Sequence, residues 1–219
     1  MELAGKIVGY DGEQLKIVVP FTDTERMIKR NIRTARVVLQ DGRCISAEQR
    51  KKIYATFNDI ADYTGHVAEE IKAFMKCDFI AATGCKEFSL SDVDMTTARY
   101  FLQHLIEFCI VWGIPTKDSL LERAPDVARY IYLCAVHKQC CVSRKKAELH
   151  HVDAVGMGRN RKEIIHLGME VIPLSSALHR EIHTIGKAAF FEKYHVFGVK
   201  ADEEICKVYK LKKGGVTYQ

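Results

Sequence analysis

The chain has 219 residues, of which 47% are hydrophobic, and it carries 33 Lys and Arg against 28 Asp and Glu. This hydrophobic content is too high for a disordered chain, and no apolar run reaches the roughly 18 residues that a membrane span needs. The net charge of +5 suits a polyanionic partner without requiring one. The start of the chain is polar and its eight cysteines are irregularly spaced, so we expect a cytoplasmic protein with reduced thiols.

The first 40 residues are predicted to form a β-hairpin and a basic helix. Strands over 6–10 and 14–19 flank Asp11-Gly12, which is a hairpin turn signal, and Pro20 ends the second strand. A further strand is expected over 35–39. The helix expected over 24–33 would align four basic residues on one face, because they are spaced three and four apart: Arg26, Lys29, Arg30 and Arg33.

Helices are predicted from residue 46 to residue 137. Ser46 and Gln49 form a capping-box pattern that starts a helix to about Tyr63. Further helices are expected over 67–76, from an N-cap at Ser91 to Trp112, and over 128–137. The chain then becomes polar and basic, so we place a domain boundary near residue 130.

Histidines are concentrated in the C-terminal part of the chain, where seven of the nine occur from His137 onward. His179 and His183 are four residues apart, so a helix capped by Ser175 or Ser176 would place both imidazoles on one face. His150 and His151 end a predicted strand over 147–152. Adjacent residues of a strand point to opposite faces, so at most one of this pair can point squarely at an ion shared with the helix.

This arrangement suits phosphodiester hydrolysis. A neutral imidazole can take a proton from the attacking water, and a divalent ion can relieve charge on the phosphate and the leaving 3′-oxygen. Each half of the pattern is short and arises by chance in many chains. The pattern is specific because the His-His pair lies in a predicted strand and the His-x-x-x-His pair follows it in a predicted helix.

These residues resemble the HNH, or ββα-metal, nuclease superfamily. Leu149-His150-His151-Val152-Asp153 is similar to its first strand, and the segment 174–183 is similar to its helix. The double histidine followed by His-x-x-x-His resembles the colicin-type DNases, and the segments 156–161 and 185–196 resemble an HNH nuclease family of tailed phages. The resemblance implies a cytoplasmic location in the host bacterial cell.

The same resemblance assigns roles to the histidines. It implies that His151 is the general base and that His150, His179 and His183 bind one divalent ion. Mg²⁺ or Mn²⁺ is the expected working ion, and an all-imidazole set would also take Ni²⁺ or Zn²⁺.

The chain departs from the family pattern at two places. Glu170 stands nine residues before His179, where the middle Asn of the HNH signature is expected, and we expect Glu170 to replace it in the catalytic site. Asn160 and His166 are alternatives for this role. Many relatives also carry two Cys-x-x-Cys pairs that bind a structural zinc. Here three of the four thiolates are missing, so we expect no such zinc and interpret Cys140 and Cys141 as core thiols.

The front of the chain has a resemblance of its own. The segment 37–54 is similar to the Orf (NinB) recombination proteins of lambdoid phages, which combine a strand, a basic turn and a helix. The similarity extends over about residues 30 to 125. It implies binding of single-stranded or branched DNA, homodimerisation and a role in phage recombination, with single-strand-binding protein as a further candidate partner.

Two groups of basic residues are predicted to contact DNA. Arg43, Arg50 and Lys51 gather at a helix start, where backbone N–H groups also favour phosphate, although a solvated basic face accounts equally well for any one of them. The second group flanks the histidines: Arg144, Lys145, Arg159 and Arg161.

Together these patterns predict an α+β chain of two parts. A mixed β-hairpin and helix DNA-binding domain is expected over 1–130, and a ββα-metal nuclease domain over 131–219. The expected reaction is hydrolysis of DNA, and the resemblance to the HNH superfamily implies 5′-phosphate and 3′-hydroxyl ends. The alternative is a non-catalytic recombination mediator with a degenerate nuclease domain. A zinc-dependent nucleobase deaminase is excluded because no His-x-Glu is followed by Pro-Cys-x-x-Cys.

Overall fold

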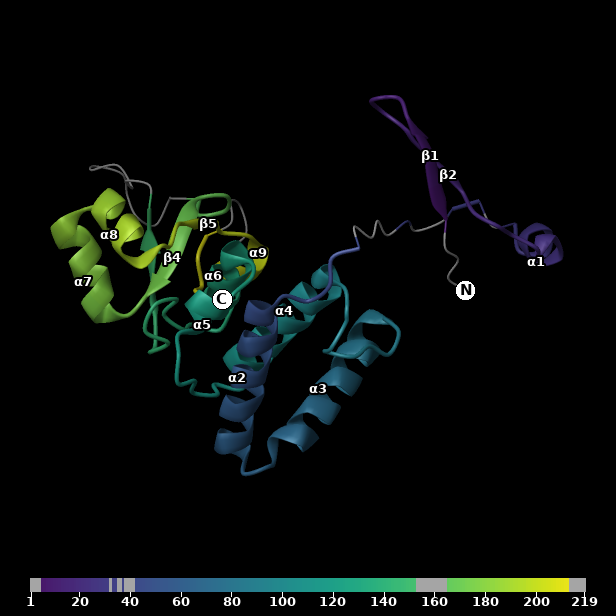
Figure 1. The fold of residues 1–219 in the computed structure, drawn as a ribbon. Coiled ribbons are helices and arrows are strands. Elements are labelled where there is room, and N and C mark those ends of the chain that lie inside the picture. The colour runs from purple at the N-terminus through teal and green to yellow at the C-terminus, as the bar shows by residue number, and fades with distance from the viewer. Residues whose placement is uncertain (1–4, 32, 35–36, 38–41, 153–164, 213–219) are drawn as a thin grey trace. The chain divides into compact units, whose positions relative to one another are not determined.

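The computed structural model describes residues 5–31, 33–34, 37, 42–152 and 165–212, and it divides into two compact units, Met1–Asp41 and Gly42–Gln219. In the first unit, β1 (Lys6–Tyr10) pairs antiparallel with β2 (Leu15–Val18), and α1 (Thr24–Lys29) follows (Figure 1). The predicted turn at Asp11-Gly12 is confirmed. Gly12 has φ +103°, and the Asp11 carboxylate accepts hydrogen bonds from the backbone N–H groups of Glu13 and Gln14.

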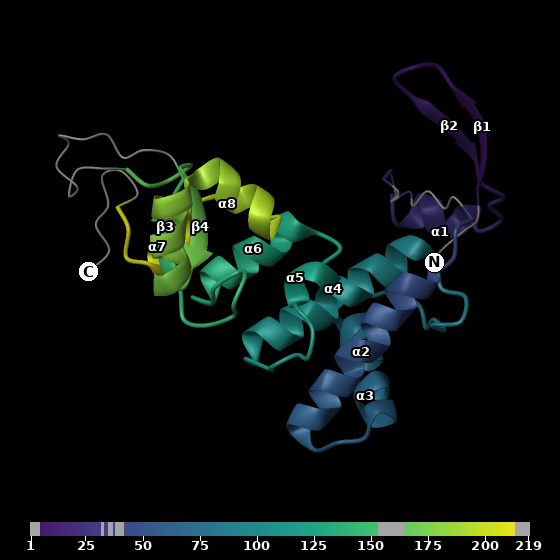
Figure 2. The ribbon, with the colours of Figure 1, turned by 60° about the vertical axis from the view of Figure 1, so that its left-hand side comes forward.

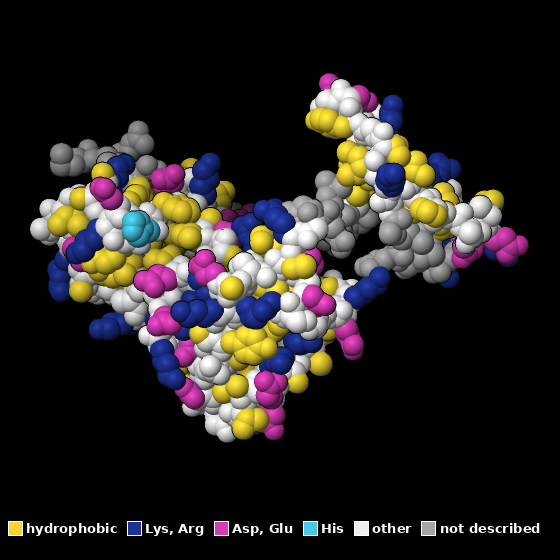
Figure 3. Space-filling model, in the orientation of Figure 1, with side chains coloured by type: hydrophobic (Ala, Val, Ile, Leu, Met, Phe, Trp, Pro, Cys, Tyr) yellow, Lys and Arg dark blue, Asp and Glu magenta, His cyan; other side chains and the backbone are white. Residues whose placement is uncertain are grey.

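The first unit has no buried side chain among its described residues. Hydrophobic side chains lie on the surface of the hairpin, including Val8, which is 58% exposed, and Tyr10, which is 70% exposed (Figure 3). Helix α1 ends at Lys29, before the end of the expected range of 24–33. The strand expected over 35–39 falls mostly outside the described residues.

The second unit begins with helices: α2 (Ala47–Thr64), α3 (Ala68–Thr83), α4 (Met95–Val111), α5 (Leu120–Arg123) and α6 (Val127–Val136). Four of them were predicted, although α3 continues past the expected end at residue 76, and the short helix α5 was not predicted. The capping box of Ser46 and Gln49 is present at the start of α2. The predicted N-cap at Ser91 is wrong. The helix begins three residues later, because the carboxylate of Asp94 accepts the hydrogen bond from the backbone N–H of Thr97.

A three-stranded antiparallel sheet follows, in the order β3 (Glu148–His151), β4 (Glu170–Leu174) and β5 (Val199–Lys200). The remaining helices are α7 (Ser176–Ile185), α8 (Lys187–Tyr194) and α9 (Glu203–Val208). Side-chain alternation along β4 divides the sheet into two faces. Ile172 packs with Ile182 of α7 and Phe190 of α8, whereas Val171 packs with Ile205 of α9. Figure 2 shows α7 against β3 and β4, with α8 next to it.

The helices and the sheet of the second unit share one hydrophobic core. Phe57, Phe101 and Tyr130 belong to the same buried cluster as Ile172 and Phe190. The mixed α+β class is therefore confirmed, with two small antiparallel sheets. The predicted domain boundary near residue 130 falls within α6, inside the second unit. The division into a DNA-binding domain and a nuclease domain stays a prediction. No helix in the described ranges is both long and apolar enough to cross a membrane.

A buried ion pair fastens α5 to α2. The Arg123 side chain is 4% exposed and donates to the Asp59 carboxylate at 2.7 Å and to the Thr56 hydroxyl at 3.1 Å. A neighbouring pair between Lys117 and Asp62 is also short, at 2.6 Å, but it lies on the surface. The two ion pairs therefore connect neighbouring parts of the fold, but one is buried in the core and the other is exposed to solvent.

We expect Arg123→Ala to lower the free energy of unfolding by about 3–5 kcal/mol, because it leaves the Asp59 carboxylate buried without a cation. Lys117→Ala is the matched control and should change stability little, since solvent screens the exposed pair. Urea denaturation followed by circular dichroism measures both. Equal losses for the two variants would contradict the structural importance assigned to the buried pair.

Candidate functional site

Three histidines from β3 and α7 converge on one point. His150 lies in β3 and is buried, while His179 and His183 lie one turn apart on α7, which packs against β3 and β4. Their ligand nitrogens all lie within 4.8 Å of one another. The ring centroids are 4.9 Å apart for His150 and each helix histidine, and 5.2 Å apart for the helix pair. The structure thus brings together the three predicted metal ligands.

The chemistry of this cluster fits a divalent ion. Burial, followed by the nearby imidazoles of His179 and His183, lowers the pKa of His150 to about 4. The ring is therefore neutral at neutral pH, and its nitrogen lone pair is available to a metal. Three imidazole nitrogens gathered at one point form a donor set that suits a first-row divalent ion. His150, His179 and His183 would hold the ion.

A carboxylate orients one of these ligands. Oε2 of Glu148 lies 2.9 Å from Nδ1 of His179, and the hydroxyl of Ser176 donates to Oε1 of Glu148 at 2.7 Å. The hydrogen bond from Ser176 and that from His179 lower the pKa of Glu148, so the carboxylate is ionised at neutral pH. A contact of this kind fixes the ring and leaves Nε2 for the metal.

Glu148 was missed by the sequence analysis, although a signal was present. It stands two residues before His150 on the same strand, and residues two apart share a face. A carboxylate on the same face as a metal-binding histidine is a natural partner for another ligand of that ion.

His151 lies next to this cluster but outside it. Its Nε2 atom is 2.8 Å from Nδ1 of His166, and the two ring centroids are 4.9 Å apart. Burial lowers the pKa of both imidazoles, and the pKa of His151 is lowered further by His166 and His179. His151 is therefore a neutral imidazole at neutral pH, close enough to the metal ligands to sense their charge.

Glu170 is the first residue of β4, and its side chain is exposed. Its backbone oxygen accepts from Val152, and Lys200 is its partner in β5. The metal-ligand cluster of the described residues does not include the Glu170 carboxylate. Its predicted catalytic role therefore stays a prediction. Of the two alternatives for the missing Asn, His166 contacts His151, and Asn160 lies outside the described residues.

The predicted DNA contacts near α2 differ in their surroundings. Arg43 and Lys51 are exposed. Arg50 donates from Nη2 to the backbone oxygen of Ser91 at 2.8 Å, so it also fastens the segment before α4 to α2.

The predicted contacts near the histidines differ as well. Arg144 donates to the backbone oxygen of Cys109 at 3.0 Å and to the side chain of Gln139 at 2.8 Å, so its guanidinium is engaged inside the protein. Lys145 is exposed, and Arg159 and Arg161 lie outside the described residues. On the described part of the face in Figure 3, Lys and Arg side chains lie among acidic and hydrophobic ones over the helices.

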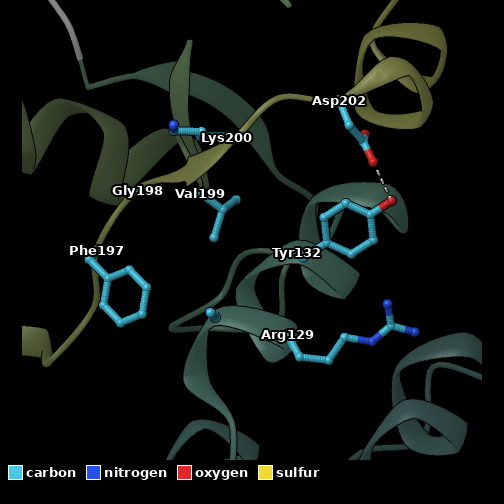
Figure 4. Close-up of a pocket in the computed structure, with 8 residues that line it drawn as sticks. Arg129, Tyr132, Phe197, Gly198, Val199, Lys200 and Asp202 are labelled. Carbon is cyan, nitrogen blue, oxygen red and sulfur yellow. Dashed lines mark hydrogen bonds between the residues drawn. The ribbon is translucent and has the colours of Figure 1, made fainter. Parts of the chain in front are cut away.

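An open cavity of about 560 Å³ lies between α6 and β5. Arg129 and Tyr132 line it from α6, and Phe197 and Lys200 line it from the segment that includes β5 (Figure 4). The hydroxyl of Tyr132 donates to Asp202 at 2.8 Å across one end. None of the three predicted metal ligands lines this cavity, so it is separate from the histidine cluster.

Comparison with known proteins agrees with the histidine geometry. A family model described as "Putative HNHc nuclease" matches residues 19–212. The chain belongs to this family. Comparison with curated proteins and with solved structures gave no match. The family match includes both the helices and the histidine cluster, and it begins after the hairpin of β1 and β2.

We expect wild-type protein to bind one divalent ion per chain at the histidine cluster. The double variant His179→Ala/His183→Ala should lose this site, because a single imidazole remains. Calorimetric titration with Zn²⁺, Ni²⁺ and Mn²⁺ measures the binding. His66→Ala removes an exposed histidine outside the cluster and serves as the control. Unchanged binding by the double variant would rule out the assignment of these ligands.

We also expect Glu148→Ala to weaken metal binding by roughly 10- to 100-fold, because His179 loses the partner that fixes its orientation. Glu148→Gln should lose less, since its amide oxygen still accepts a hydrogen bond from Nδ1. The same titration compares the two variants. If both bind metal as tightly as the wild type, Glu148 has no part in orienting the ligand.

Proposed function

We propose that the protein is a metal-dependent DNA endonuclease of the HNH type. The observation that supports this most directly is the convergence of His150, His179 and His183 beside a neutral His151. Membership of the HNHc family supports a nuclease, and the proposal divides the four imidazoles into three metal ligands and one proton acceptor.

In the proposed reaction, His151 acts as the general base. Its Nε2 atom is engaged with His166, so Nδ1 takes a proton from the attacking water. The water oxygen then forms a bond to phosphorus, and the bond from phosphorus to the 3′-oxygen breaks. The leaving 3′-oxygen takes a proton from solvent, so the products are a 5′-phosphate and a 3′-hydroxyl. A divalent ion held by the three histidines would stabilise the negative charge that develops on the phosphate.

Further parts of the proposal rest on the resemblance of segment 37–54. We propose that the substrate is single-stranded or branched DNA, and that the exposed cations Arg43, Lys51 and Lys145 contact its phosphates. A homodimer, a partnership with single-strand-binding protein and a role in phage recombination belong to the same proposal.

A recombination mediator without catalysis is the second candidate function. The observation that favours it is Glu170 at the position of the HNH Asn, with an exposed carboxylate that is not part of the metal-ligand cluster in the described residues. Such a protein would bind DNA and metal but would not cleave.

We expect His151→Ala to slow cleavage by about 10²–10⁴-fold, which is the usual contribution of a general base. DNA binding and metal binding should stay close to wild type, because the base acts only in the transition state. Single-turnover cleavage of single-stranded, duplex and branched oligonucleotides measures the rate, with Mg²⁺, Mn²⁺, Co²⁺, Ni²⁺ or Zn²⁺ present. Wild-type protein that cleaves none of these substrates would replace the nuclease proposal with the mediator.

Glu170→Gln is the companion variant in the same assay. An amide keeps a hydrogen-bond acceptor but is a poorer metal ligand than a carboxylate. Retained cleavage would indicate that Glu170 accepts a hydrogen bond, and cleavage lost together with metal affinity would make Glu170 a fourth ligand.

A further inference from the structure

We propose that His166 is the positioning residue for the general base, and that it performs this role through its side-chain Nδ1 atom. The inference rests on the proposed function of His151. His166 stands at the start of the turn before β4, and the base that it would position, His151, lies at the end of β3.

The geometry of the two rings carries the proposal. Nε2 of His151 lies 2.8 Å from Nδ1 of His166, which is the distance of a hydrogen bond. Within the described part of the chain, no partner is found for the other nitrogen of His151. If Nε2–H of His151 donates to Nδ1 of His166, Nδ1 of His151 keeps its lone pair and can accept a proton. The opposite tautomer would place a hydrogen on that atom and remove its basicity.

The protein backbone fixes His166 on both sides. Its N–H donates to the oxygen of Lys212, and its oxygen accepts from Met169 in a turn that contains Gly168 at φ +81°. The N–H of Gly168 donates to Ala201, which follows β5. These bonds join the turn to the segments that follow β5 and α9, neither of which carries a histidine of the cluster.

Strand alternation explains why Glu170 does not take this role. His151 is paired with Val171 in β4, and paired residues share a face of the sheet. Glu170 is the neighbour of Val171, so its side chain starts on the other face, the face of His150. A residue that reaches His151 from its own side must come from outside β4, and the turn before this strand supplies it.

The hydrogen bond can be measured in metal-free, full-length protein at neutral pH. Nitrogen NMR of the histidine side chains should show His151 and His166 both protonated at Nε2, with a scalar coupling between Nε2 of His151 and Nδ1 of His166. His166→Leu should lose the coupling. Protonation of His151 at Nδ1, or the absence of a coupling in the wild type, would overturn the proposal.

The catalytic consequence is tested by comparing two amides. The side chain of Asn carries its polar atoms on Cγ, as His carries Nδ1, whereas Gln carries them one atom further out. We expect His166→Leu and His166→Gln to slow single-turnover cleavage by roughly 10- to 100-fold, as expected for a misplaced catalytic group. His166→Asn should recover most of the rate. DNA affinity should be the same in all variants.

Two cleavage results would contradict the inference. Wild-type rates in His166→Leu would show that the base needs no partner, and equal losses in Asn and Gln would show that the position of the polar atom is unimportant. A wild-type protein that cleaves no DNA would instead remove the proposed function, and with it the catalytic part of this inference. The NMR measurement would still decide whether the hydrogen bond exists.

Discussion

The site depends on one geometric constraint, which is the alternation of side chains along β3. His150 and His151 are adjacent, so the strand sends their imidazoles to opposite sides. On one side, α7 supplies two more imidazoles, and together they can bind an ion. On the other, the turn before β4 supplies His166. The two adjacent histidines therefore have separate surroundings: His150 joins the histidine cluster, and His151 contacts His166.

Each side of the strand has its own supporting contact. Glu148 orients His179 by a hydrogen bond to Nδ1, and His166 lies against His151 at a similar distance. The two supporting groups, a carboxylate and an imidazole, differ in charge, and each suits the histidine that it contacts. An ionised carboxylate strengthens a ligand that faces a cation. A neutral imidazole can accept a hydrogen bond from the base while itself remaining a weak base in its partly buried site.

Much of the site could be predicted from sequence, because its signals are local. The spacing of His179 and His183 predicts a shared helix face, and strand alternation predicts that only one of His150 and His151 joins them. The contact between His151 and His166 could not be predicted, since the intervening residues have no periodic pattern that brings their ends together. The helix start at Asp94 was missed because both Ser and Asp are good N-caps, and tertiary packing decides between them.

The loop before β3 is joined by hydrogen bonds to several elements, and these contacts position the strand. Cys141 donates its N–H to Pro173 of β4, and its oxygen accepts from the hydroxyl of Tyr130 in α6. Arg144 joins the same loop to the end of α4. Burial raises the pKa of Cys141, so its thiol stays protonated at neutral pH. Hydrogen bonds to two helices and a strand thus fix the start of β3, and the position of His150 follows from them.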